Sequence, residues 1–261
     1  MIAIKSPEEI DRIASNGRRL AEVLDRLAEA VRPGVTTADL DRLADEAIRS
    51  WAGAVPSFKG YNGFPASICT SVNDEVVHGI PSRRRRLERG DIVSVDVGIY
   101  RDGWHADSAR TFTIGEVDAE SLRLLEVTEV CLELGLAELA AGRTLGDLAA
   151  AIQAHAEAAG FSVVRELVGH GIGRRLHEEP QVPNYGVRGQ GLRLKAGMVL
   201  AVEPMVNAGG APVETLEDDW TIRTVDGSRS AHFEHTVAIT EHGCRVLTVA
   251  AEAGAGARAA S

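Results

Sequence analysis

The sequence lacks the features that mark secreted and membrane proteins. It has three cysteines, Cys69, Cys131 and Cys244, an odd number at spacings that match neither a disulfide framework nor a zinc knuckle. No apolar run approaches the roughly eighteen residues of a membrane span, and no basic-then-apolar signal pattern opens the chain. We therefore expect reduced thiols in a soluble protein of the cytoplasm, with no membrane partner.

Positive charge is also scarce. Against 28 lysines and arginines stand 38 aspartates and glutamates, for a formal net charge of −10. Such a surface repels a phosphate backbone, which argues against specific DNA as a partner. The exception is the run Arg83 to Arg86. We interpret this run as a solvated loop, with weak docking to a ribosome or another RNA as the alternative.

Helical and strand patterns come in two similar batches. The segment 6–9, Ser-Pro-Glu-Glu, predicts a capped helix start, and Pro33 predicts the end of that helix. Further helices are expected at 38–51, 118–141 and 145–159, and strands at 91–100, 104–114, 197–203 and 231–249.

Residues repeat as well as elements. Two patterns occur once in each batch: Gly-x-Thr-x-x-Asp-Leu at 34–40 and 142–148, and His-Gly-Ile at 78–80 and 170–172. Each His-Gly-Ile tripeptide precedes a strand that runs from a glycine to a carboxylate, Asp96 or Glu203. This order indicates an internal duplication, with halves at about 5–115 and 118–249.

Two such halves pack most simply about a pseudo-twofold axis. Equivalent residues would then lie opposite one another near the axis. His78 would face His170, and Asp96 would face Glu203. The histidine of the second tripeptide and its counterpart are therefore expected to serve one central site.

The first half also contains a predicted hairpin. If the turn at 102–103, Asp-Gly, is a two-residue loop, Asp107 lies opposite Gly98. Asp107 is then diagonal to Asp96 on the same face, within about 7–8 Å between backbones. By the duplication, Glu234 of the second half is the expected partner of Asp107.

Four facing carboxylates cannot all stay ionised without compensation, because like charges a few ångströms apart raise each other's pKa. The strand segments that end at Asp96 and Glu203 contain no lysine or arginine. A single aspartate in a strand is usually an edge residue, and a single histidine is usually a satisfied core group. Five such residues arranged by a duplication instead favour two divalent cations, with His170 as a nitrogen ligand. Mostly oxygen ligands suit Mn(II), Fe(II) or Co(II), and paired ions suit hydrolysis.

The sequence resembles the type I methionine aminopeptidases of the short bacterial form, which are metallopeptidases with the pita-bread fold. The resemblance covers roughly residues 4–249. It is carried by SVNDEVVHGIP, VDVGIYRDGWHADSARTF, GHGIGRRLHEEPQVPNYG, the EPM of VLAVEPMV, and TIRTVDGSRSAHFEHTVAIT. It implies an α+β fold of two pseudo-twofold-related ααββ halves, in which helices cover a curved antiparallel sheet.

The resemblance also implies how the metals are held. Asp96 would chelate one ion, and Asp107 and Glu234 would bridge both. His170 and Glu203 would complete the coordination of the second ion. The cofactor would be two divalent ions per subunit, either Co, Mn, Fe(II) or Zn.

Three residues have implied catalytic roles. His177 would hydrogen-bond the scissile carbonyl oxygen, His78 would contact the substrate near the scissile amide, and Glu203 would move a proton from the nucleophile to the leaving amine. The implied substrate-binding residues are Tyr61, Phe64, Cys69, His78, His177 and Trp220. Ordinary core positions are the alternative for the three aromatic residues of this set. Phe58 and Phe64 replace a cysteine and a tyrosine of some relatives, which leaves preferences beyond methionine open.

The implied function is removal of the initiator methionine from nascent polypeptide N-termini, by hydroxide attack at the dinuclear centre, when the second residue is small and uncharged. We expect a monomer with one catalytic domain at 1–249 and a flexible, low-complexity tail at 250–261. Two alternatives are a proline-specific aminopeptidase of the same fold, which usually carries a further N-terminal domain, and a non-catalytic binding homologue, which typically has lost metal ligands.

Overall fold

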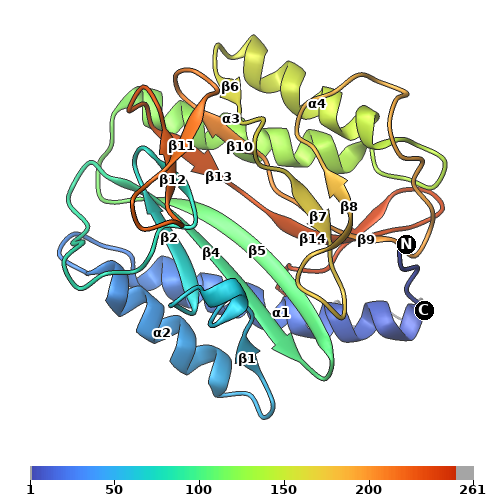
Figure 1. Ribbon diagram of the computed structural model, residues 1–261, viewed down its shortest axis with the longest axis horizontal. Coiled ribbons are helices and arrows are strands. Elements are labelled where there is room, and N and C mark those ends of the chain that lie inside the picture. The colour runs from blue at the N-terminus through green and yellow to red at the C-terminus, as the bar shows by residue number, and fades with distance from the viewer. Residues whose placement is uncertain (1, 251–261) are drawn as a thin grey trace, which may run out of the picture.

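Helices cover antiparallel sheets in a mixed fold (Figure 1). The structure is a computed structural model that describes residues 2–250. The predicted tail at 250–261 lies outside the described residues, apart from residue 250. Within the described range, every helix is too short or too polar to span a lipid bilayer.

The predicted helices are present, each within a few residues of its expected ends. They are α1 (Pro7–Ala30), α2 (Thr37–Arg49), α3 (Ala119–Ala137) and α4 (Leu145–Ala158), and a short 3₁₀ helix, η1, covers Tyr61–Gly63. The Ser6 hydroxyl accepts from the Glu9 N–H, and the Glu9 carboxylate accepts from the Ser6 N–H. This reciprocal cap satisfies two backbone groups at the start of α1 and explains why the helix begins there.

The strands form two larger sheets and two smaller ones within residues 2–250. In the first larger sheet β4 (Ile92–Arg101) pairs with β1 (Val55–Pro56), β2 (Ile68–Val72) and β5 (Trp104–Thr113). The second has the order β15 (Cys244–Val246), β14 (His235–Ile239), β9 (Val199–Val202), β7 (Gly169–Gly171) and β8 (Glu178–Val182). The smaller sheets join β6 (Ser162–Val163), β10 (Met205–Asn207) and β13 (Ser230–His232), and β3 (Glu75–Val77), β11 (Val213–Thr215) and β12 (Ile222–Thr224).

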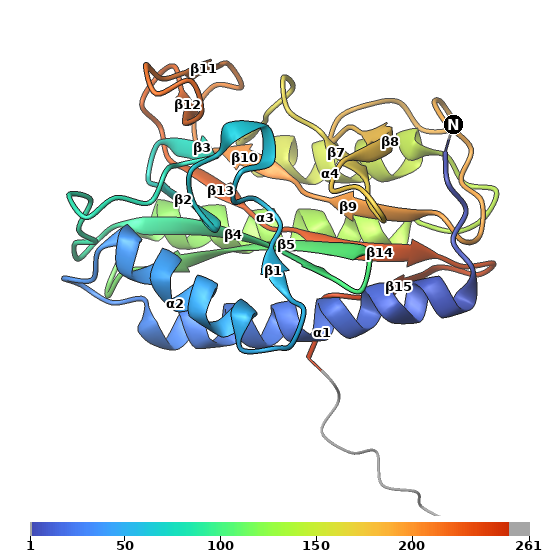
Figure 2. The ribbon, with the colours of Figure 1, turned by 60° about the horizontal axis from the view of Figure 1, so that its bottom comes forward.

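Each pair of helices packs on its own sheet (Figure 2). Leu20 and Leu24 of α1 are fully buried in a core that includes β4 and β5. Leu124 of α3 and Ile152 of α4 are buried with β9 and β14. Burying one such side chain contributes about 1.5–3 kcal/mol, so the two cores fix the helices against the sheets and leave the other side of the sheets for a site.

A seam of hydrogen bonds joins β5 to β14 and so links the two larger sheets. The Thr236 hydroxyl accepts from the Asp107 N–H at 2.9 Å and donates to the Asp107 carbonyl at 2.7 Å. The Glu234 N–H donates to the Ala109 carbonyl at 3.0 Å. The seam therefore brings Asp107 of the first sheet beside Glu234, which directly precedes β14.

The predicted hairpin and its register are confirmed. Gly98 of β4 is the partner of Asp107 of β5, and Arg101 pairs with Trp104 across the turn. Asp102 and Gly103 both have positive φ, 52° and 84°. These angles suit the tight turn that Asp-Gly favours between twisted strands.

The single strand predicted at 231–249 is wrong. The segment contains β13, β14 and β15, with breaks at 233–234 and around 240–243. Before the first break β13 pairs with β10, and after it β14 pairs with β9. Between them the Glu234 N–H donates to the Ala109 carbonyl of β5. At the second break, the Thr240 N–H donates to the Gly243 carbonyl in a turn.

The repeated Gly-x-Thr-x-x-Asp-Leu pattern produces the same local structure twice. Thr36 and Asp39 form a capping box at the start of α2, and Thr144 and Asp147 form one at the start of α4. In each copy the threonine also makes an isolated β-bridge to an arginine farther along the chain, Arg86 or Arg193. Each arginine in turn donates to the carbonyl of the repeat's first glycine, Gly34 or Gly142.

The expected equivalence of His78 and His170 is wrong. His170 lies on β7, which pairs directly with β9. The segment 78–80 is one strand farther out, because β2 pairs with β4 and the Thr70 N–H of β2 donates to the Gly79 carbonyl. In strand order β7 corresponds to β2, and 78–80 corresponds to β8. In the second half β8 follows the tripeptide at 170–172, whereas in the first half β2 and β3 precede the tripeptide at 78–80. The two identical tripeptides therefore occupy different positions in the two sheets.

Candidate metal centre

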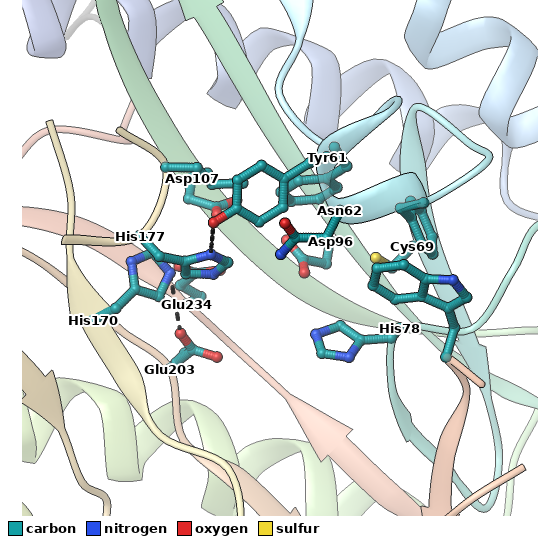
Figure 3. A pocket seen from close by; sticks show the side chains of 14 residues that line it. Tyr61, Asn62, Cys69, His78, Asp96, Asp107, His170, His177, Glu203 and Glu234 are labelled. Carbon is teal, nitrogen blue, oxygen red and sulfur yellow. Dashed lines mark hydrogen bonds and ion pairs between the residues drawn. The ribbon is translucent and has the colours of Figure 1, made fainter. Parts of the chain in front are cut away.

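One cavity of about 190 Å³ brings the predicted site residues together (Figure 3). The sequence-predicted residues that line it are Tyr61, Phe64, Cys69, His78, Asp96, Asp107, His170, His177, Glu203, Trp220 and Glu234. Phe58, Asn62 and Leu176 complete the lining. Asn62 and Leu176 were not predicted, although each is a direct neighbour of a predicted residue in the sequence.

The carboxylates come from both larger sheets. Asp96 lies on β4 and Asp107 on β5, and they are diagonal neighbours in the observed register. Glu203 directly follows β9, and Glu234 directly precedes β14. The hairpin therefore sets the first pair, and the seam between β5 and β14 brings the second pair to it.

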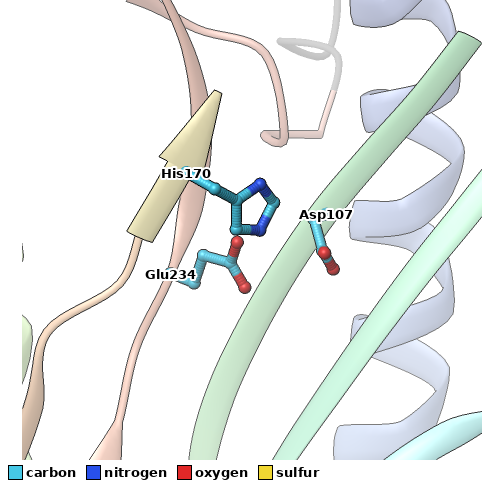
Figure 4. A group of neighbouring side chains, drawn as sticks. All are labelled: Asp107, His170 and Glu234. Carbon is cyan, nitrogen blue, oxygen red and sulfur yellow. The ribbon is translucent and has the colours of Figure 1, made fainter. Parts of the chain in front are cut away.

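The tightest group of donor atoms among residues 2–250 joins Asp107, His170 and Glu234 (Figure 4). One ligand atom from each lies within 4.8 Å of the others. Glu203 adjoins this group, with Oε1 at 3.6 Å from Nε2 of His170. Asp96 adjoins it through Asp107, its diagonal neighbour across β4 and β5.

Burial raises the pKa of all four carboxylates. Burial raises the pKa of Asp96 to about 7. Burial, followed by the charges of the neighbouring carboxylates, raises the pKa of Asp107, Glu203 and Glu234 well above the usual range. Concentrated negative charge of this kind calls for a positive partner.

Two buried oxygens support a cation as that partner. Within residues 2–250, Oδ1 of Asp96 and Oε1 of Glu234 are buried and make no hydrogen bond. A buried carboxylate oxygen without a partner is costly in free energy. The unpaired oxygens and the mixed oxygen and imidazole donors fit a divalent cation.

His170 has the tautomer that a metal ligand needs. Its Nδ1 lies 2.9 Å from the carbonyl oxygen of Gly171, which can only accept a hydrogen bond. The proton of the neutral ring is therefore on Nδ1, and Nε2 carries the free lone pair. Burial, followed by the charge of His177, lowers the pKa of His170 to about 3, which keeps the ring neutral.

His177 contacts His170 of the donor group on one side and Tyr61 on the other, while other aromatic residues form a wall of the cavity. Nδ1 of His177 lies 2.8 Å from Oη of Tyr61, and the His177 ring centroid is 4.1 Å from that of His170. Phe64 and Trp220 pack edge to face at 5.1 Å. The ring of His78 is 6.4 Å from that of Trp220, and burial lowers the pKa of His78 to about 4.

Cys69 adds a small apolar surface to this wall. It lies directly opposite Asp96 in the pairing of β2 with β4. Burial, followed by the charge of Asp96, raises the pKa of its thiol well above the usual value. The thiol is therefore protonated and unreactive.

A further polar group missed in the sequence is His232, which is 1% exposed. Its Nε2 lies 3.8 Å from Oε2 of Glu203. Its position two residues before Glu234 in a strand-like stretch was the available signal.

The arginine run lies outside the cavity lining. Arg83 to Arg86 are exposed, in agreement with a solvated loop.

Comparison with known proteins identifies the family of this chain. Residues 11–241 match the model of metallopeptidase family M24. The chain belongs to this family. A methionine aminopeptidase of Clostridium acetobutylicum is 51% identical over 249 residues, which are 95% of this chain and 99% of that protein. Methionine aminopeptidase 1 of Bacillus subtilis is 52% identical over 248 residues, with the same coverage of 95% and 99%.

A solved structure has the same fold. The crystal structure of methionine aminopeptidase from Rickettsia prowazekii superimposes with a TM-score of 0.93 at 42% identity, covering 95% of this chain and 100% of that one. The resemblance and the α+β fold class predicted from the sequence are confirmed.

Proposed function

We propose that this M24 metallopeptidase removes the initiator methionine from nascent proteins whose second residue is small and uncharged. The observation that carries the proposal is the single cavity in which the donor group meets an apolar and aromatic wall, with His177 in contact with His170. The names of the relatives, methionine aminopeptidases at 51–52% identity over nearly the whole chain, support the same activity.

Five residues would hold the metal: Asp96, Asp107, His170, Glu203 and Glu234. Their four carboxylates carry a formal charge of −4 when ionised, which two divalent ions would balance. We propose two ions, of Co, Mn, Fe(II) or Zn, because a single ion leaves half of that charge uncompensated. When bound, such ions activate water and polarise a carbonyl group.

His177 is the proposed stabiliser of the reacting carbonyl oxygen. If Tyr61 Oη–H donates to Nδ1, the proton of the neutral ring is on Nε2. This N–H would donate to the scissile carbonyl oxygen as negative charge develops on it. Burial lowers the pKa of His177, so the ring is neutral at pH 7.

Glu203 is the proposed proton carrier. Its side chain is 14% exposed and lines the cavity in which water and substrate would meet. It would accept a proton from the water and deliver it to the amine. His78, from the opposite side of the cavity, would contact the substrate near the scissile amide.

The wall of the cavity would bind the methionine side chain. Cys69, Phe64 and Trp220 offer an apolar surface with two aromatic rings, which make favourable contacts with a thioether sulfur. The cavity of about 190 Å³ is small, and this favours removal of a single residue at a time. We further expect a monomer that acts in the cytoplasm, and weak ribosome docking through Arg83–Arg86 stays a prediction.

The proposal can be tested with three tripeptides. Chelator-stripped protein is incubated with Met-Ala-Ser, Met-Leu-Ser or Ala-Pro-Ser, with and without added Mn(II) or Co(II), and the released residue is measured. We expect metal-dependent release from Met-Ala-Ser alone. Release from Ala-Pro-Ser instead would indicate a proline-specific enzyme of the same fold, and no release from any peptide would indicate a binding protein.

A further inference from the structure

A buried ion pair lies next to the segment that carries His177. Nζ of Lys5 is 2.8 Å from Oε2 of Glu178, and the two side chains are only 3% and 9% exposed. The Lys5 backbone N–H also donates to the Gly197 carbonyl, just before β9. In Figures 1 and 2 the segment ahead of α1 runs beside the second larger sheet, so it can hold that sheet from outside.

Glu178 connects this pair to the loop at 173–177. It directly follows His177, and its other oxygen, Oε1, accepts from the Arg175 N–H at 3.1 Å. A Cβ added to Gly173 would lie 2.8 Å from Oε1 of Glu178 and 2.8 Å from Cε of Lys5. The loop therefore lies directly on the ion pair, and a side chain at position 173 would have to displace the ends of Glu178 and Lys5.

Such a pair is a weak contributor to stability, because removing two charges from water costs about as much as their attraction returns. It does impose a specific geometry, since a buried carboxylate must keep both its lysine and its backbone donor. The His177 ring itself contacts the cavity through one hydrogen bond to Tyr61 and the ring of His170. Its position thus depends on how the loop backbone is held.

We propose that Lys5 is a positioning residue for catalysis. It fixes the carboxylate of Glu178, which fixes the loop at 173–177, and the loop sets the distance from His177 to the substrate carbonyl. The inference depends on the proposed function, in which His177 stabilises that oxygen. It assigns a catalytic consequence to the N-terminal segment, which does not line the cavity.

The test compares wild-type protein with Lys5→Met and with the double variant Lys5→Met/Glu178→Gln. The double variant removes both charges and keeps an acceptor for the Arg175 N–H. Because small misplacements of a catalytic group are costly, we expect kcat on Met-Ala-Ser to fall roughly ten- to hundredfold, with KM and metal content little changed. Amide hydrogen exchange over 173–178 should become faster.

Two controls separate positioning from general damage. Arg245→Met removes the exposed ion pair of Arg245 with Asp11 and should leave kcat unchanged. In a His177→Ala background, Lys5→Met should cause no further loss of kcat, because its effect passes through His177.

The outcomes are distinct. A wild-type protein that releases no methionine contradicts the proposed function. An active wild type whose kcat is unaffected in the folded variants overturns the inference about Lys5, as does a loss that adds fully to that of His177→Ala. If neither variant folds, the pair is required for folding, and a positioning role is overturned as well.

Discussion

At the scale of single residues, two neighbouring histidines differ in their hydrogen-bond partners. The Gly171 carbonyl holds the proton of His170 on Nδ1, which frees the Nε2 lone pair for a metal. If the Tyr61 hydroxyl donates to Nδ1 of His177, the proton of that ring is on Nε2, which is the donor that the proposed function requires. The rings are only 4.1 Å apart between centroids, so their hydrogen-bond partners, more than their location, separate the two roles.

This distinction predicts the behaviour of His177→Ala. Loss of one donor to a developing oxyanion should lower kcat on Met-Ala-Ser about 10²- to 10³-fold, while metal content stays at the wild-type level. Steady-state kinetics and elemental analysis of the same sample provide the measurement. His242→Ala, at an exposed turn, is the control and should match the wild type. A loss of metal in His177→Ala would contradict the role.

The carboxylates predict proton release on metal binding. In metal-free protein the pKa of Asp96 is about 7, and those of Asp107, Glu203 and Glu234 are well above the usual range. Metal binding requires the ionised forms, so protons must leave and the metal affinity should rise with pH. Calorimetric titration with Mn(II) at pH 6.5, in buffers of different ionisation enthalpy, measures the released protons. Identical heats in all buffers would show that the carboxylates were already ionised.

At the scale of elements, the seam between β5 and β14 brings the two parts of the donor set together. Each larger sheet supplies only part of the donor set, and the Thr236 hydroxyl bonds to both backbone groups of Asp107 across the seam. Thr236 is fully buried, so no water can replace these bonds without rearrangement.

We expect Thr236→Val, which keeps the shape and removes the hydroxyl, to reduce the free energy of unfolding by about 1–3 kcal/mol. It should also weaken metal binding. Thr128→Val is the matched control, because Thr128 is equally buried but donates only within its own helix, to the Leu124 carbonyl. Urea unfolding and Mn(II) titration measure both effects. Equal losses for the two variants, with unchanged metal affinity, would show that the seam does not organise the site.

At the scale of the whole molecule, short sequence patterns predicted the features that residues close in the chain determine, such as turns, caps and hairpin register. The Asp-Gly turn fixed the register that places Asp107 opposite Gly98, and the cap at Ser6 fixed the start of α1. The four carboxylates were predicted because the hairpin and the duplicated strands place them at matching positions, and His170 was predicted from its His-Gly-Ile tripeptide. All five line one cavity.

What escaped prediction depends on pairing between distant strands. The interruption between β13 and β14 at 233–234 exists because the Glu234 N–H bonds to β5. No residue pattern within 231–249 indicates that contact. The two His-Gly-Ile tripeptides are identical, yet the order of β2 and β8 around them differs, so identity of sequence misled the assignment of partners. The pair of Lys5 with Glu178 joins residues 173 positions apart in the chain.

The most direct test of the account is a titration of chelator-stripped protein with Mn(II), in which bound metal and methionine release from Met-Ala-Ser are measured on the same samples. The account predicts no release without metal, release that grows as metal binds, and saturation at two ions per chain. Release by metal-free protein, or none at saturating metal, would contradict it.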